Sequence, residues 1–263
     1  MIDSQTALVV GASRGIGLAI TRQLLEQKNL RRVYASYRDR ESAAGLLGIN
    51  DERLLSLRLD VTNPDDFKAL ADAIKTNGDR PDYVIHCAGI LHEDGLQPEK
   101  ALSQCRQDKL LRMFQVNSVG PLLLARAIVP LMPKDRPAQF AALSAMVGSI
   151  GDNRLGGWYG YRASKAALNQ FMRTLAVECN RSHPQLCITA IHPGTTDTAL
   201  SKPFQSNVRP GKLYSASRSA ARILKVVSAG EPSQSGRFVN WDGKPIPCLL
   251  YTSDAADDTQ FVG

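Results

Sequence analysis

The sequence predicts a single α/β domain in which a parallel seven-stranded sheet is covered by helices on both faces. Three observations predict this fold class. Short apolar runs alternate with stretches of helical periodicity along most of the 263 residues. A glycine-rich turn follows the first apolar run and opens a helix. Small or polar residues follow five of the apolar runs, where a parallel sheet binds its ligands. No stretch is typical of a linker, so we expect one domain over residues 1–247.

The apolar runs give the expected strands, at residues 6–10, 33–37, 53–59, 82–86, 139–143, 186–191 and 238–240. The segment from Thr62 to Asp66 is typical of a helix start, because Pro64 follows a polar cap and acids follow the proline. A long helical stretch is expected from about Leu102 to Met132, with a break near Gly120 and Pro121. This alternation is typical of a Rossmann-type, doubly wound sheet.

The turn from Gly11 to Gly17 is the most informative stretch of the chain. Its glycines let a ligand approach the backbone, and the N–H groups at the start of the next helix suit a pyrophosphate. Glycine clusters also form ordinary turns, but the flanking strand and helix favour a phosphate site. The spacing G-x-x-x-G-x-G differs from the G-x-G-x-x-G dinucleotide fingerprint and indicates a related but distinct family.

Residues at the expected strand ends should meet at one crevice, because the carboxyl ends of parallel strands lie along one edge of the sheet. Each residue alone would be unremarkable, and their agreement along five strands favours a binding site there. The residues are Arg38, Asp60, Ala88 with Gly89, Ser144, and Pro193 with Gly194.

Tyr161 and Lys165 are four residues apart on an expected helix that continues to about Glu178, so they share one helix face. A phenol titrates near pH 10, and a neighbouring ammonium lowers that pKa. We therefore expect Tyr161 to act as a general acid or base. An isolated Y-x-x-x-K pattern is more often a pair of surface residues. Its place after the glycine turn and after Ser144 favours the catalytic interpretation.

With these features the sequence resembles the short-chain dehydrogenase/reductase family from about Thr6 to Pro247. The segments Gly148–Asn153 and Gly156–Tyr161 look like the branch of the C-factor and sniffer-type carbonyl reductases. The positions that match family motifs are Gly11, Gly15, Gly17, Asp60, Val61, Ala88, Gly89, Asn117, Tyr161, Lys165, Pro193, Gly194 and Thr198.

The resemblance implies hydride transfer between a nicotinamide cofactor and a carbonyl carbon. Tyr161 would protonate the carbonyl oxygen, and Ser144 would donate a hydrogen bond to it. Lys165 would hold the nicotinamide ribose and tune Tyr161, and Asn117 would carry a water that links Lys165 to solvent. The cofactor-binding set implied by the resemblance consists of the matching positions other than Asn117, together with Ser13, Arg14, Ile16, Arg38 and Thr196.

The residues after the second expected strand favour NADP(H) over NAD(H). Relatives that use NAD(H) place an acid at the end of this strand, whereas Tyr37 stands here and Arg38 follows it. Arg14 supplies a second guanidinium, and two guanidiniums suit a 2′-phosphate.

Three departures from the family pattern concern hydrogen-bonding residues. Val10 replaces a threonine, and His86-Cys87 replaces a pair of asparagines. By strict spacing the catalytic serine position falls on Ala145. Either Ser144 reaches the site, or Ser149 substitutes for it, or the serine has a weakened role; we favour Ser144.

Composition limits the other function classes. The net charge of +7 comes from dispersed Lys and Arg residues without interleaved aromatics, so we expect no nucleic-acid partner. The five cysteines are scattered and show no C-x-x-C spacing, which predicts free thiols and no metal site. No apolar window reaches the length of a membrane span and no secretory signal stands at the N-terminus, so a cytoplasmic protein is expected. Residues 248–263 are expected to be an irregular, acidic tail, and an origin outside the natural gene product is one interpretation of it.

Substrate and assembly are the least determined features. The composition of the segment Thr198–Leu213 is typical of a mobile lid, and four apolar residues are candidates for a pocket that accepts a small or medium hydrophobic aldehyde or ketone: Met146, Trp158, Leu200 and Phe204. The resemblance implies a homodimer or homotetramer. A rival interpretation is a dinucleotide-binding signalling or regulatory protein with little turnover. The presence of Asn117, Tyr161 and Lys165 favours an enzyme.

Overall fold

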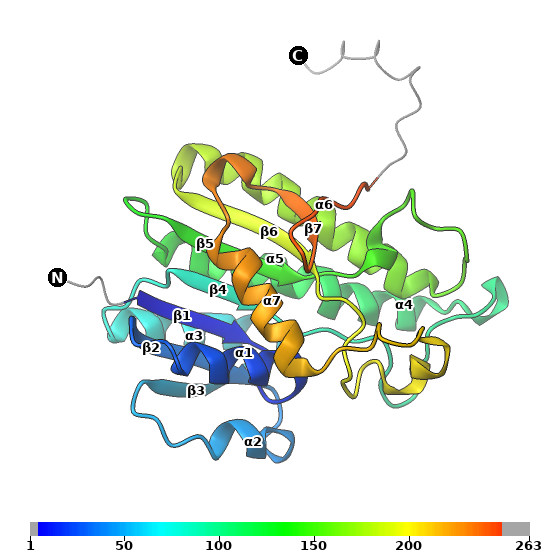
Figure 1. Cartoon of the computed structure of the whole chain (residues 1–263), viewed down its shortest axis with the longest axis horizontal. Helices are drawn as coiled ribbons and strands as arrows, with labels where there is room; N and C mark the ends of the chain where they lie inside the picture. Colours follow the sequence, from blue (N-terminus) through cyan, green and yellow to red (C-terminus); the bar gives the residue numbers. More distant parts are fainter. Residues whose placement is uncertain (1–4, 249–263) are drawn as a thin grey trace, which may run out of the picture.

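The computed structural model describes residues 5–248, which form a seven-stranded sheet between two layers of helices (Figure 1). Every strand pair is parallel, and the strand order is β3-β2-β1-β4-β5-β6-β7. This confirms the predicted fold class. The strands are β1 (Gln5–Val10), β2 (Leu30–Tyr37), β3 (Leu54–Arg58), β4 (Tyr83–His86), β5 (Ala138–Leu143), β6 (Leu186–His192) and β7 (Arg237–Asn240).

Helices cover both faces of the sheet because alternate strand residues are apolar on each side. Leu8 and Val10 of β1 point to one face, and Ala7 and Val9 point to the other. The first face packs against α3 (Pro64–Thr76), α5 (Gly120–Ile128) and α6 (Tyr159–Ser182). The second packs against α1 (Gly15–Leu25), α2 (Ala44–Leu47) and α7 (Ala216–Ser228). The order of strands reverses between β1 and β4, which places a crevice at their carboxyl ends.

The long helical run differs from the prediction of a break near Gly120 and Pro121. It begins at α4 (Gln107–Phe114) and passes through a π-helical segment, Gln115–Val119, directly into α5. Gly120 donates its N–H to the carbonyl of Gln115, five residues back. Pro121 has no N–H to donate, and its ring would clash with a carbonyl in a regular helix. The wider π turn just before the proline accommodates it without ending the helix.

Within residues 5–248, the run Gln107–Leu131 has the length and composition of a membrane-spanning helix, and its most apolar 18-residue window has a mean hydropathy of 1.3. The sequence prediction that no window approaches a span was therefore wrong. Half of the most apolar window is buried inside the domain, where Val116, Leu124 and Ile128 pack. A core helix passes the same test, so length and composition are weak evidence for a span.

Cys248, the last residue that the structure describes, stands one position after the predicted domain boundary at residue 247 and contacts the domain. The carbonyl of Cys248 accepts hydrogen bonds from the N–H groups of Ile150 and Gly151, so Cys248 belongs to the domain. The rest of the proposed tail, residues 249–263, lies outside the described residues. All five cysteines carry free thiols.

Candidate active site

A pocket of about 790 Å³ lies at the carboxyl ends of the strands and is lined by residues from both halves of the sheet. Asn117, Gly194 and Thr196 are the predicted site residues that do not line it. The predicted residues that do line it are Gly11, Ser13, Arg14, Gly15, Ile16, Gly17, Arg38, Asp60, Val61, Ala88, Gly89, Ser144, Tyr161, Lys165, Pro193 and Thr198. The structure therefore brings the glycine turn and the Tyr–Lys pair to one cavity.

The glycine turn is packed so closely that side chains are excluded from it. A Cβ on Gly17 would lie 2.1 Å from the carbonyl oxygen of Gly11. Gly11 has a φ of +81°, and a Cβ there would lie 2.6 Å from the backbone nitrogen of Ala88. Among the described residues no side chain caps the N-terminus of α1, so its first N–H groups remain available to a ligand. The bare turn and the uncapped helix fit the pyrophosphate of a dinucleotide.

Tyr161 and Lys165 both face the pocket from the first turns of α6. Tyr161 is 7% exposed and Lys165 is 4% exposed. The Nζ atom of Lys165 lies 5.8 Å from the centre of the Tyr161 ring and donates a hydrogen bond of 2.8 Å to the carbonyl of Leu143. The two side chains thus share one face, as their spacing predicts.

The predicted lowering of the Tyr161 pKa is wrong. Burial raises the pKa of the Tyr161 phenol above its ordinary value, and burial lowers the pKa of Lys165 to about 8. The reason is desolvation, which penalises the charged form of each group. The ammonium of Lys165 is directed at the Leu143 carbonyl, so it does not offset the desolvation of the phenol.

Of the two candidate serines, Ser144 lines the pocket. It follows β5, is buried, and donates its hydroxyl proton to Oδ1 of Asn169 at 2.7 Å. The hydroxyl of Ser149 donates instead to the carbonyl of Pro247, away from the pocket lining. Ala145 packs against the small apolar cluster that contains Tyr161. Sequence reasoning missed Asn169, although its place four residues after Lys165 puts it on the same helix face.

Asn117 lies behind the pocket wall, in the π-helical segment. Its Oδ1 accepts the N–H of Ile90, and its Nδ2 donates to the carbonyl of Ile90, both at 2.8 Å. Nδ2 also lies 3.1 Å from the hydroxyl of Ser164 on α6. The side chain therefore fastens the loop after β4 to the helix that carries Tyr161.

His86 and Cys87 stand where the family pattern has asparagines, and both are neutral here. Burial, and to a smaller extent the charge of Lys165, lowers the pKa of His86 to about 3. Burial raises the pKa of the Cys87 thiol to about 12. His86 thus adds no second positive charge beside Lys165.

The loop after β6 divides between lining and support. Pro193 and Thr198 line the pocket, whereas Gly194 packs under Trp241 and the hydroxyl of Thr196 lies 2.7 Å from that of Ser219. Gly194 and Thr196 thus hold this loop in place.

The predicted apolar pocket is only partly observed, because Leu200 lines the cavity while Met146, Trp158 and Phe204 do not. The Phe204 ring packs edge-on against Trp158, with centroids 5.1 Å apart, and against His92. Trp158 has a φ of +51°, a left-handed conformation that is uncommon for a bulky residue. The side chains of Trp158 and Phe204 thus pack against each other and do not line the pocket.

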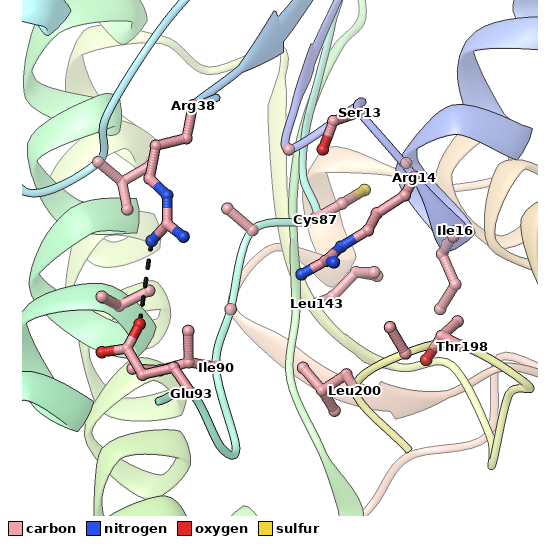
Figure 2. Close-up of a pocket in the computed structure, with 18 of the residues that line it drawn as sticks. Ser13, Arg14, Ile16, Arg38, Cys87, Ile90, Glu93, Leu143, Thr198 and Leu200 are labelled. Carbon is pink, nitrogen blue, oxygen red and sulfur yellow. Dashed lines mark ion pairs between the residues drawn. The ribbon is translucent and has the colours of Figure 1, made fainter. Parts of the chain in front are cut away.

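A charged cluster lies at the end of the pocket near β2 and β3. Arg38 and Glu93 face each other, with Nη1 and Oε2 3.9 Å apart, and Arg14 extends into the pocket from the opposite side (Figure 2). Arg112 of α4 donates to Glu93 through Nε at 2.7 Å. Partial burial of Asp60 works against ionisation, but hydrogen bonds from Thr62 and the charges of Arg38 and Arg112 lower its pKa. Sequence reasoning missed Glu93 and Arg112, because ion pairs between distant segments leave no local pattern.

Comparisons with known proteins agree with this geometry. The family model described as short chain dehydrogenase matches residues 5–209. The chain is 32% identical to 1-hydroxy-2-glutathionyl-2-methyl-3-butene dehydrogenase of Rhodococcus sp. (strain AD45), over 90% of this chain and 97% of that protein.

Two solved structures have the same fold. The NADPH-bound carbonyl reductase from chicken fatty liver superimposes with a TM-score of 0.81 at 28% identity, covering 92% of this chain and 94% of that one. The carbonyl reductase Sniffer of D. melanogaster also gives a TM-score of 0.81, at 27% identity, covering 93% and 99% of the two chains. The chain therefore belongs to the short chain dehydrogenase family, is an oxidoreductase, and resembles the sniffer-type carbonyl reductases as its motifs predict.

Proposed function

We propose that this protein is an NADP(H)-dependent reductase that converts an aldehyde or ketone to an alcohol, with Tyr161 as general acid. The observation that carries the proposal is that one pocket joins the bare glycine turn to Tyr161, Lys165 and Ser144. The fold neighbour that binds NADPH and is named a carbonyl reductase supports it.

The residues of the pocket divide the binding of the cofactor between them. The N–H groups at the start of α1 would hold the pyrophosphate, and Asp60 and Val61 would border the adenine. Arg38 and Arg14, on opposite sides of the pocket, are the guanidiniums proposed for the 2′-phosphate. The bound cofactor supplies a hydride to the carbonyl carbon.

The protein's own contribution is to hold and deliver a proton at the carbonyl oxygen. Because burial raises the pKa of Tyr161, its phenol stays protonated at neutral pH and is ready to donate. The Nζ atom of Lys165 lies 5.8 Å from the ring centre, and the ammonium would stabilise the phenolate that donation leaves behind once it turns from the Leu143 carbonyl toward Tyr161. Ser144 exchanges its hydrogen bond to Asn169 for one to the substrate oxygen. We also propose that Asn117 holds a water that links Lys165 to solvent.

The test is consumption of NADPH by the purified protein against a panel of hydrophobic aldehydes and ketones. We expect Tyr161→Phe to lower kcat by about 100-fold or more, while the Kd for NADPH changes little. A Tyr161→Phe variant as active as the wild type would show that Tyr161 is not the general acid. A wild type that binds NADPH and turns over no carbonyl would favour the signalling or regulatory alternative.

The sequence also suggests a cytoplasmic location and a homodimer or homotetramer, and both remain proposals. Cell fractionation tests the first. Light scattering of the purified protein tests the second.

A further inference from the structure

We propose that Glu93 competes with the cofactor's 2′-phosphate for Arg38 and so sets how strongly the protein prefers NADP(H) over NAD(H). This inference rests on the proposed function. The ligand is the phosphate on the adenosine ribose. When it binds, it would replace the Glu93 carboxylate as the anion paired with the Arg38 guanidinium.

The first observation is the position of Glu93. It lies in the loop after β4, 55 residues from Arg38 in sequence, yet both side chains line the same pocket. Figure 2 shows the Arg38 guanidinium turned toward the Glu93 carboxylate, with Arg14 on the opposite side of the pocket. Arg38, the proposed partner of a 2′-phosphate, is therefore already paired with Glu93.

The second observation is that Arg38 is the weaker of two partners of Glu93. Arg38 lies 3.9 Å from Oε2, and its side chain is 54% exposed. Arg112 binds the same carboxylate at 2.7 Å through Nε, and Nη2 lies 3.4 Å from Oε2. The hydrogen bond from Arg112 is the main reason that the pKa of Glu93 lies below its usual value, with Arg38 and Lys109 adding to the effect.

This asymmetry makes the exchange easy. When a phosphate reaches Arg38, the guanidinium can leave Glu93 at little cost, because the carboxylate keeps its ion pair with Arg112. A long, exposed ion pair contributes little free energy, whereas a phosphate offers Arg38 more charge and a bidentate acceptor. With an unphosphorylated ribose, Arg38 stays with Glu93. The carboxylate thus reduces the gain from a 2′-phosphate without affecting the rest of the cofactor.

The experiment compares the affinities of 2′,5′-ADP and 5′-AMP, which differ only in that phosphate, by calorimetry on the full chain. We expect Glu93→Gln to tighten 2′,5′-ADP by about two- to fivefold, the size expected for an exposed ion pair, and to leave 5′-AMP within about 1.5-fold. Arg112→Gln should weaken 2′,5′-ADP, because Glu93 then turns fully to Arg38. That weakening should shrink in the double variant Glu93→Gln/Arg112→Gln.

The control is Asp108→Asn, which removes one negative charge from an exposed residue of α4 that does not line the pocket. If Glu93→Gln changes the two ligands no more than Asp108→Asn does, or changes both equally, the proposal is overturned. A wild type that binds 2′,5′-ADP no better than 5′-AMP contradicts the proposed NADP(H) preference. A gain of 2′-phosphate preference in Glu93→Gln would still support the role of Glu93 in that case.

Discussion

Replacing Asn117 by alanine should destabilise the protein as well as slow it. The side chain is fully buried and satisfies both the N–H and the carbonyl of Ile90 at 2.8 Å. Alanine would leave these two partly buried backbone groups without their partner. A fully buried unsatisfied group costs about 1–3 kcal/mol, so the two together should cost somewhat less than twice that amount. We therefore expect Asn117→Ala to lower the free energy of unfolding by about 2–5 kcal/mol.

The assay is urea unfolding followed by tryptophan fluorescence, with NADPH turnover measured on the same samples. Asn77→Ala is the matched control, because Asn77 is exposed and makes a single hydrogen bond to Ala73 at the end of α3. We expect that control to stay within about 0.5 kcal/mol of the wild type. If Asn117→Ala lost turnover but unfolded like the control, the residue would act only through a water, and the reasoning from the Ile90 contacts would fail.

The remaining predictions concern the two serines and the buried lysine. Ser144→Ala should lower kcat by about tenfold or more, whereas Ser149→Ala should mainly lower thermal stability. Initial rates and Tm values of the two variants test this. The reverse pattern would make Ser149 the catalytic hydroxyl. Lys165 has a pKa of about 8, below its unfolded value of 10.5, so the unfolded state binds more protons between these values and stability should rise as pH rises from 8 toward 10.5. Lys165→Met should abolish turnover, remove this pH dependence and raise the free energy of unfolding at pH 7 by about 1–3 kcal/mol. Urea unfolding at pH 7 and 9.5 measures the change in stability. If the pH dependence of the variant equalled that of the wild type, the argument from the burial of Lys165 would be contradicted.

Much of the fold could be predicted because its signals are local. Each of these signals lies within a few residues of sequence. The structure has strands at the apolar runs, α1 directly after the glycine turn and α3 directly after the cap at Asn63. The helix break predicted at Pro121 is not observed, because it depends on the shape of the preceding turn. A proline disrupts a regular helix, but the sequence does not show that the preceding turn widens to accept it.

Most residues that line the candidate site could be predicted from their motif positions, whereas Glu93, and the contacts of Arg112 and Asn169 beside the site, could not. The motif positions of the glycine turn and the Tyr–Lys pair meet at one pocket because they stand at the carboxyl ends of parallel strands and at helix starts. The pKa of Tyr161 could not be predicted from its spacing to Lys165, since burial depends on the whole fold. The pairing of Glu93 with Arg112 and Arg38 depends in the same way on tertiary contacts.

Charge is used differently at the two ends of the pocket. At the end with Tyr161, which we propose is the catalytic end, Lys165 is buried, so its charge costs folding free energy and its pKa falls. At the other end Arg38 is half exposed, so its pairing with Glu93 is weak and can be exchanged. Substitutions at the catalytic end should therefore alter stability and pH dependence together. Substitutions of Arg38 or Glu93 should change cofactor preference and leave both of those properties almost unaffected, which is the separation that a change of cofactor without a change of chemistry requires.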